Sequence, residues 1–349
     1  MSPEIGGRPI GPDVPVFAIA EIGLNHGGDL ERALRMVDAA AQSGASAIKL
    51  QTLFADRLVA ESCPAPAHVE AASLREFFTA FELDAAAHRA VVSRARRHGL
   101  AVLSTPFAED VVPMLASLDI DAFKIASGDL TYDGLIAAVA RTGKPVVIST
   151  GMATLEEAAR AVRVARCAGA AQVAVLHCVS AYPTPAGSEN LSAIDTLAGA
   201  LGVPVGLSDH STGGVISAVA AVALGACIYE RHFMLDDGVD AIDAAVSSTP
   251  ADFRTIVTAM EAARVALGDG RKRCLAAEAP NVVPSRRGLY TRRPMRAGER
   301  ITVADVIALR PATAVSPGEL SRLVGSVLDR DLAAGEAFQL RDIAVEKAS

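Results

Sequence analysis

Two histidines, each placed where an apolar run ends, are the residues of this chain best suited to chemistry. His210 follows Asp209 in Gly-Leu-Ser-Asp-His, and His232 lies two residues after Glu230 in Tyr-Glu-Arg-His-Phe. Neutral imidazole is a preferred ligand of divalent transition metals, and a nearby carboxylate can fix its tautomer. We predict that both histidines bind a metal whose open positions take water or substrate. Two hydrogen-bonded core histidines are the alternative.

Other apolar runs also end in polar side chains. Lys49 and Lys124 lie among Ala, Ile, Leu and Phe, where an unpaired ammonium is costly unless it meets an anion or forms a Schiff base. Two lysines suit a phosphate or phosphate–carboxylate ligand better than an imine, which needs only one. The alternative is a pair of internal salt bridges to acids nearby. The polar residues at these strand ends are Glu21, Asn25, Gln51, Thr105, Ser127, Asp129, Ser149, Ser180, Tyr182 and Ser208, with Glu21 and Asp129 as the acids.

The elements that position these residues are short apolar runs that alternate with helix-period segments. Near-continuous apolar runs are typical of parallel strands covered on both faces. The runs span residues 16–21, 47–51, 100–105, 122–126, 145–150, 172–178, 203–208 and 226–231. Eight such units predict an α/β fold, a (β/α)8 TIM barrel over residues 1–270, in which the strand ends share one mouth and the last two strands are neighbours. A doubly wound open sheet is less suitable, because the chain has no G-x-G-x-x-G fingerprint.

Residue types also mark where helices begin and end. Gly44, Gly99 and Gly143 fall where helix C-caps are expected. Asp133 and Thr154 are the candidate N-caps.

The connection over residues 52–83 is longer than the others and contains Phe77, Phe78 and Phe81. A connection of this length is usually functional or carries its own helix. We interpret it as a lid or a dimer contact.

The remaining histidines have less context. We expect His88 and His98 to be surface residues of a helix, and His26 to help shape the barrel mouth. His177 and Cys178 are adjacent, but neighbouring strand residues point to opposite faces. Nucleophilic cysteine chemistry is therefore not expected.

Composition limits the class of protein. The chain has 349 residues, of which 51% are hydrophobic and 21% charged, enough for a barrel and a small second domain. The net charge of −7 argues against a nucleic-acid partner. The five cysteines have no C-x-x-C spacing and no signal-peptide pattern is present, which indicates a cytoplasmic protein. The Ala/Gly-rich segment over 213–229 is too short for a membrane span, so we expect no membrane partner.

The barrel pattern ends after Gly268-Asp-Gly270. We predict a polar linker over residues 271–285 and a small β-rich domain over 286–349. This domain contains an internal repeat, in which Arg293-Pro-Met-Arg-Ala-Gly-Glu299 leads to Asp305 as Arg330-Asp-Leu-Ala-Ala-Gly-Glu336 leads to Asp342. About 60 residues bury little surface, so we expect the domain to pack on a partner.

The ordered motifs resemble one known family, the sialic acid (N-acetylneuraminate) synthases and their relatives that make other nonulosonic acids. The matching pieces are AEIGLNHGG, IKLQT, LSTPF, KIASGDL, VVISTGM, LHCVSAYPTP, GLSDHSTG and YERHF. The repeat-bearing tail, with Ile307-Ala-Leu-Arg-Pro311, looks like the family's antifreeze-like (SAF, β-clip) domain. The resemblance covers nearly the full chain.

The resemblance implies condensation of phosphoenolpyruvate with the open-chain aldehyde of an N-acyl hexosamine such as N-acetylmannosamine. Phosphate and a nine-carbon 2-keto-3-deoxy acid are released, with Mn2+ or Mg2+ as cofactor. The matching positions are His210 and His232 at the metal; Lys49, Lys124, Ser127, Ser149, Ser180 and Ser208 around phosphoenolpyruvate; and Glu21, Gln51, Tyr182 and Asp243 around the sugar or metal-bound water. Arg310 matches a tail arginine that reaches the neighbouring barrel, which implies a domain-swapped homodimer.

The chain departs from the family pattern at three places. Asp243-Ala-Ala-Val-Ser247 replaces an Asp-His-Lys-Ala-Ser stretch, Ala312-Thr-Ala314 replaces a glycine-rich one, and Leu130-Thr-Tyr132 replaces an Asn-rich turn. All three lie where the sugar is expected. The acceptor therefore stays open among neuraminic, legionaminic, pseudaminic and related types.

Two other functions fit the same residues. A lysine Schiff-base aldolase would be trapped at Lys49 or Lys124 by borohydride with pyruvate and would keep its activity in EDTA. A non-catalytic sugar-phosphate-binding protein would show no turnover, although both histidines, both lysines and Glu21 are present.

Overall fold

The computed structural model describes residues 3–64 and 71–342. Internal contacts divide the chain into two compact units, Met1–Gly268 and Asp269–Ser349. The first contains the predicted strands and the second contains the repeat. None of the helices in the described part of the chain is long and apolar enough to cross a membrane.

The first unit is a closed parallel barrel, which confirms the TIM-barrel prediction and excludes the open sheet. Its strands, in the described ranges, are β3 (Phe17–Gly23), β4 (Ala47–Thr52), β5 (Ala101–Pro106), β6 (Ala122–Ile125), β7 (Val146–Ser149), β8 (Val173–Cys178), β9 (Val205–Asp209) and β10 (Ile228–His232). Each strand pairs with the next, and β10 pairs with both β9 and β3. That last pairing closes the sheet.

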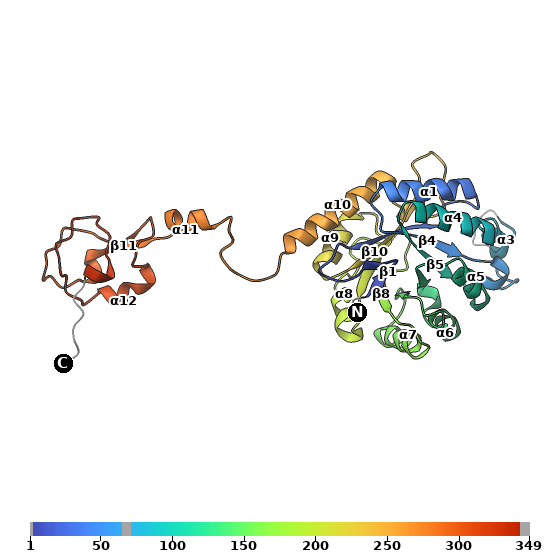
Figure 1. The fold of residues 1–349 in the computed structure, drawn as a ribbon, viewed down its shortest axis with the longest axis horizontal. Coiled ribbons are helices and arrows are strands. Elements are labelled where there is room, and N and C mark those ends of the chain that lie inside the picture. Colours follow the sequence, from blue (N-terminus) through green and yellow to red (C-terminus); the bar gives the residue numbers. More distant parts are fainter. Residues whose placement is uncertain (1–2, 65–70, 343–349) are drawn as a thin grey trace. The chain divides into compact units, whose positions relative to one another are not determined.

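Helices surround the strands, as Figure 1 shows. The main ones are α1 (Leu30–Gln42), α4 (Ala85–Arg97), α5 (Val112–Ser117), α6 (Asp133–Ala140), α7 (Leu155–Cys167), α8 (Ala193–Leu201), α9 (Val215–Ala223) and α10 (Pro250–Leu267). Their apolar faces pack on the outer face of the barrel in one large buried cluster. A second cluster fills the barrel interior at the amino ends of the strands and includes Ile5 and Ile10. Ile5 belongs to a hairpin formed by β1 (Glu4–Ile5) and β2 (Arg8–Pro9), and Ile10 directly follows it.

The predicted helix ends are correct with one exception. Gly44, Gly99 and Gly143 have φ of 85°, 68° and 73°, the left-handed conformation that favours glycine at a helix end. Thr154 caps α7 in a capping box. Asp133, however, is the first residue of α6 and does not cap it. Its carboxylate instead accepts a hydrogen bond from Arg160 on α7 at 2.5 Å.

The long connection between β4 and α4 carries helices of its own, as one reading of its length expected. These are α2 (Ala55–Leu58) and α3 (Leu74–Thr79). The ring of Phe77 lies 5.3 Å from that of Phe78 and 5.1 Å from that of Phe81. Residues 65–70 of this connection lie outside the described ranges.

The prediction for His88 is wrong, because this side chain is buried. It lies on the inner face of α4, one position after Ala87 and three before Val91, which are also buried. Its Nε2 is 2.8 Å from the Thr52 hydroxyl, and its Nδ1 is 2.9 Å from the Asp84 carbonyl oxygen. His98 is exposed, as expected.

In the second unit, the two halves of the internal repeat form equivalent ion pairs. Arg293 pairs with Glu299 at 2.8 Å and with Asp305 at 2.9 Å. Arg330 likewise pairs with Glu336 at 2.7 Å and with Asp342 at 2.8 Å. In each half, one arginine therefore links the glycine turn to the aspartate that follows it. The described elements of this unit include α11 (Ala279–Ser285), which lies in the predicted linker, β11 (Gly288–Thr291), β12 (Val306–Leu309) and α12 (Leu320–Leu323). Residues 343–349 lie outside the described ranges.

The buried histidines predict how stability depends on pH. Burial lowers the pKa of His26 to about 4 and also lowers that of His88. Between pH 6.5 and 4 the unfolded chain therefore binds protons that the folded chain does not. The free energy of unfolding should fall as pH drops through this range, by up to about 3 kcal/mol for His26.

Urea unfolding at pH 7 and pH 4.5 measures this effect. His26→Asn, whose amide oxygen can still accept the Gly28 N–H, should show a smaller loss of stability than the wild type. The exposed His98 provides the control, and His98→Asn should keep the wild-type loss. Equal losses in the wild type and His26→Asn would refute the assignment.

Candidate active site

The interior of the barrel changes from apolar to polar along its axis. Inward-facing residues recur every second position, so an apolar residue deep in the barrel is followed by a polar one nearer the mouth. On β4 the sequence is Ala47, Lys49, Gln51, and on β10 it is Ile228, Glu230, His232. The carboxyl ends of the strands therefore share one polar cavity.

This cavity has a volume of about 300 Å3. Its lining includes eleven of the fourteen predicted site residues, namely Lys49, Gln51, Thr105, Lys124, Ser127, Ser149, Ser180, Tyr182, Ser208, His210 and His232. Glu21 lies beside it in contact with Lys49, and Asp243 lies beside it next to His232. Arg310 belongs to the second unit. Phe107, Met152, Cys178 and Glu230 also line the cavity and were not predicted as site residues.

Lys49 lies between two buried acids. Its Nζ pairs closely with Glu21, is 3.7 Å from Glu230 Oε2 and donates to Thr105 Oγ1 at 3.4 Å. Burial lowers the pKa of Lys49, but the two carboxylates together raise it above its usual value. Burial raises the pKa of Glu21 in spite of the neighbouring ammonium. The internal salt bridge considered for Lys49 is thus formed, inside the cavity rather than apart from it.

Lys124 is held differently. Its Nζ donates to Ser149 Oγ at 2.6 Å and to the Ile125 carbonyl at 3.3 Å, and it is 3.6 Å from Glu230 Oε1. The ion pair is therefore with Glu230 and not with the Asp129 considered from the sequence. Burial lowers the pKa of Lys124, an effect that Glu230 partly offsets.

The two imidazoles lie together at the mouth. Their ring centroids are 5.5 Å apart, and the Tyr182 ring lies 4.1 Å from that of His210. The Val179 carbonyl oxygen is 3.0 Å from Nδ1 of His210. A carbonyl only accepts, so Nδ1 carries the proton and Nε2 keeps a free lone pair.

The acids expected to orient the imidazoles have other partners, which corrects that prediction. Asp209 points outward and accepts from the Tyr229 hydroxyl at 2.7 Å. Glu230 points inward one layer below His232 and contacts the lysines. The acid near His232 is Asp243, whose Oδ2 is 3.2 Å from Nδ1.

Asn25 positions the loop that carries Asp243. Its Oδ1 accepts the Asp243 backbone N–H at 3.0 Å, and its Nδ2 donates to the Phe233 carbonyl at 3.0 Å. The side chain is buried. One amide therefore joins the end of β3 to the segment that follows β10.

The donor set fits an open metal site. Nδ1 of His232 faces the Asp243 carboxylate at 3.2 Å, and this orientation leaves Nε2 to bind a metal. Within the described residues no group of three or more His, Cys, Asp or Glu side chains is arranged to hold a metal ion. Two imidazoles can thus supply two ligands, and the remaining positions would have to come from water or substrate.

The hydroxyl groups gather around one glycine. A Cβ built on Gly151 would lie 2.1 Å from Ser180 Oγ and 2.7 Å from Ser127 Oγ, so only glycine allows this approach. The Gly151 N–H donates to Ser127 Oγ at 3.0 Å. Nothing in its spacing marked Gly151 as a site residue, because the constraint comes from two other strands.

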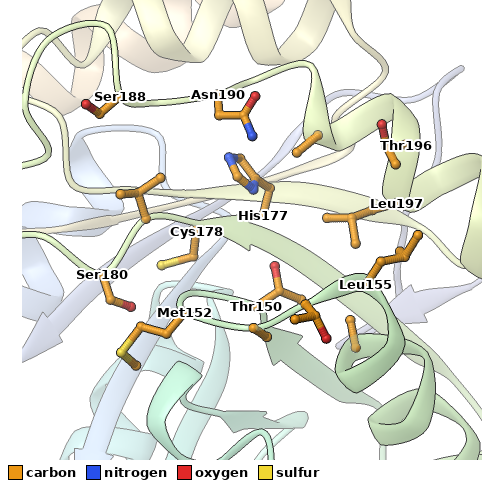
Figure 2. A pocket seen from close by; sticks show the side chains of 15 residues that line it. Thr150, Met152, Leu155, His177, Cys178, Ser180, Ser188, Asn190, Thr196 and Leu197 are labelled. Atoms are coloured by element: carbon orange, nitrogen blue, oxygen red, sulfur yellow. The ribbon is translucent and has the colours of Figure 1, made fainter.

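A second cavity of about 490 Å3 adjoins the first and shares Met152, Cys178 and Ser180 with it. Figure 2 shows His177 directed toward Asn190 and Cys178 toward Ser180. His177 Nε2 is 2.7 Å from the Glu189 carbonyl, whereas Cys178 Sγ is 3.7 Å from Nδ1 of His210. The adjacent residues thus do not form a thiol–imidazole pair, as expected from strand geometry.

A parallel barrel with this polar mouth, followed by a small domain with an internal repeat, defines the class of protein. The chain matches the NeuB family model over residues 36–272 and the SAF domain model over residues 286–344, and it belongs to the NeuB family. The resemblance to nonulosonic acid synthases with a C-terminal SAF domain is therefore confirmed.

Individual relatives support the same placement. The chain is 35% identical over 339 residues to N,N'-diacetyllegionaminic acid synthase of Legionella pneumophila, with 95% of each chain covered. It is 33% identical to a pseudaminic acid synthase of Campylobacter jejuni, covering 95% of this chain and 97% of the relative. The solved structure of N-acetylneuraminic acid synthetase from Leptospira borgpetersenii with citrate is similar with a TM-score of 0.74 and 35% identity, covering 81% of this chain and 95% of that one.

The ion cluster predicts a large effect on stability. Lys49→Met leaves Glu21 and Glu230 buried without their shared ammonium, so we expect a loss on the order of 3–5 kcal/mol. Lys49→Met combined with Glu21→Gln should recover part of it. Lys144→Met removes a more exposed pair with Asp119 and should cost less than about 1 kcal/mol. Urea unfolding compares the four proteins, and equal losses for Lys49→Met and Lys144→Met would contradict the prediction.

Proposed function

We propose that this protein condenses phosphoenolpyruvate with the open-chain aldehyde of an N-acyl hexosamine, N-acetylmannosamine or a related 2,4-diacetamido sugar. The products are phosphate and a nine-carbon 2-keto-3-deoxy acid. The observation that carries the proposal is one cavity in which two buried ammonium groups face two imidazoles. The names of the relatives, which are nonulosonic acid synthases, support the same reaction class.

The anionic substrate would lie between the lysines and the hydroxyl groups. Phosphate and carboxylate oxygens accept strong hydrogen bonds from ammonium groups, and Lys49 and Lys124 supply these from two different strands. The hydroxyl groups that would complete the contacts belong to Thr105, Ser127, Ser149, Ser180 and Ser208. In the proposed arrangement, fixing both ends of phosphoenolpyruvate would direct its C3 toward the imidazoles and the approaching aldehyde.

His210 and His232 would hold Mn2+ or Mg2+, which when bound would polarise the aldehyde oxygen. The chain contributes the orientation of the ligands. The Val179 carbonyl fixes the tautomer of His210, and Asp243 lies beside His232.

The proposed reaction needs only phosphoenolpyruvate, the aldehyde and water as reactants. C3 of the enol forms a bond to the aldehyde carbon, water adds at C2, and the C2–O bond to phosphate breaks to give the keto group. Glu21 lies at the cavity with a raised pKa, which suits either proton transfer or orientation of sugar hydroxyls. Gln51 and Tyr182 also line the cavity and would contact the sugar.

The acceptor and the assembly are further parts of the proposal. Because Ala244, Ala245 and Val246 follow Asp243 in place of the family's His, Lys and Ala, we propose 2,4-diacetamido sugars as candidate acceptors beside N-acetylmannosamine. We propose a domain-swapped homodimer in which Arg310 reaches the acyl group in the neighbouring barrel. The free cysteines suit a cytoplasmic enzyme.

A phosphate-release assay with phosphoenolpyruvate and Mn2+ tests the function. The acceptor panel contains 2-acetamido and 2,4-diacetamido hexoses, and mass spectrometry identifies the nine-carbon product. We expect turnover that EDTA abolishes, and at least a 100-fold loss in His232→Ala with an unchanged circular dichroism spectrum, as is typical when a metal ligand is removed. Absence of turnover with every sugar would overturn the proposal. Borohydride trapping of pyruvate on Lys124 or Lys49, with activity intact in EDTA, would favour the aldolase.

The close approach at Gly151 gives a second prediction. Gly151→Ala displaces the Ser127 and Ser180 hydroxyls, so KM for phosphoenolpyruvate should rise by roughly tenfold or more, the effect of losing at least one hydrogen bond to a charged group. Gly199→Ala is the matched control, because nothing lies within 4 Å of its added Cβ. Steady-state kinetics measure both variants. A Gly151→Ala enzyme with wild-type KM would show that these hydroxyls do not contact the substrate.

A further inference from the structure

Among the described residues that line the cavity, Glu230 is the one acid. It is the middle inward-facing residue of β10, one layer below His232, and its register partner on β9 is Ser208. Its exposed fraction is 4%. Each of its two carboxylate oxygens lies within 4 Å of an ammonium group.

One carboxylate therefore serves two ammonium groups that come from different strands. Glu230 Oε1 is 3.6 Å from Lys124 Nζ, and Oε2 is 3.7 Å from Lys49 Nζ. Ser208 fixes the carboxylate by donating to Oε1 at 2.8 Å. Lys49 has Glu21 as a second acid, but Glu230 is the acid within 4 Å of Lys124 among the described residues.

The distances between Glu230 and the two lysines leave the ammonium groups able to bind a ligand. At 3.6–3.7 Å the charges attract, but the carboxylate takes up no N–H donor of either lysine. An ammonium group has three donors, and Lys124 uses two of them on Ser149 and Ile125. One donor of Lys124 is left to bind an anion.

We infer that Glu230 is a positioning residue that holds the ammonium groups of Lys49 and Lys124 at the phosphoenolpyruvate end of the cavity while leaving their donors free for that ligand. This rests on the proposed function, because the ligand is its anionic substrate. Glu230 itself would contact neither the sugar nor the reacting carbons.

Isothermal titration calorimetry with phosphoenolpyruvate and Mn2+, without sugar, tests the inference. Glu230→Gln keeps the shape and removes the charge, so the Kd should rise roughly tenfold or more. Glu230→Asp keeps the charge at shorter reach and should give an intermediate Kd. In turnover, Glu230→Gln should raise KM for phosphoenolpyruvate while KM for the sugar stays within about twofold, a split that general loss of structure would not produce. Asp119→Asn removes an exposed acid that pairs with Lys144 and is the control.

A wild-type Kd in folded Glu230→Gln would overturn the inference, and if that variant does not fold, a wild-type Kd in Glu230→Asp would do so. A wild type that binds no phosphoenolpyruvate would instead refute the proposed function. Reductive methylation at pH 8, read by peptide mass spectrometry, then decides the role of Glu230 alone. Faster labelling of Lys124 in Glu230→Gln supports the inference, because neutral amine is the reactive form, and unchanged labelling refutes it.

Discussion

The pairing of β10 with β3 is the constraint on which the site depends. It closes the barrel and places His232 opposite Glu21, and Glu21 in turn lies opposite Lys49 on β4. On the other side of β10, Glu230 lies opposite Ser208 on β9. A sheet left open at this seam would separate Glu230 and His232 on β10 from Glu21 on β3 and Lys49 on β4. The two ends of the cavity therefore meet only in the closed form.

Closure also explains why the cavity contains balanced charges. Two ammonium groups and two carboxylates, from Lys49, Lys124, Glu21 and Glu230, are almost fully buried. Neither sign could be buried alone, because the desolvation cost of an unpaired ion is several kcal/mol. The balance leaves no surplus positive charge for a trianionic ligand. A divalent metal at the imidazoles would supply that charge, which links metal binding to substrate binding in the proposed function.

Much of the fold followed from the sequence because eight near-continuous apolar runs, in a chain without a G-x-G-x-x-G fingerprint, match a closed barrel better than an open sheet. The positions of Lys49, Lys124, His210 and His232 followed from strand ends alone. The predictions that were wrong share one cause, because each depended on which face of a strand or helix the side chain lies on. Asp209 was assigned to His210 by proximity in sequence, and His88 was expected on a helix surface. Alternation along β9 and the inner face of α4 decide where these two side chains point. Glu230 could have been found from the same alternation, since it lies two residues before His232.

The residues of the Tyr-Glu-Arg-His motif on β10 lie alternately on the two faces of the strand. Tyr229 and Arg231 face outward, where the Tyr229 hydroxyl and the Arg231 guanidinium both contact the Asp209 carboxylate, and Arg231 also donates to the Ser211 carbonyl and to Ser248. These contacts join β10 to the end of β9 and to the loop that follows His232. Gly206 allows the strands to approach, since a Cβ there would lie 2.2 Å from the Ile228 carbonyl oxygen. A shift of one residue along this seam would exchange the two faces. The outward network therefore fixes the register that directs Glu230 and His232 into the cavity.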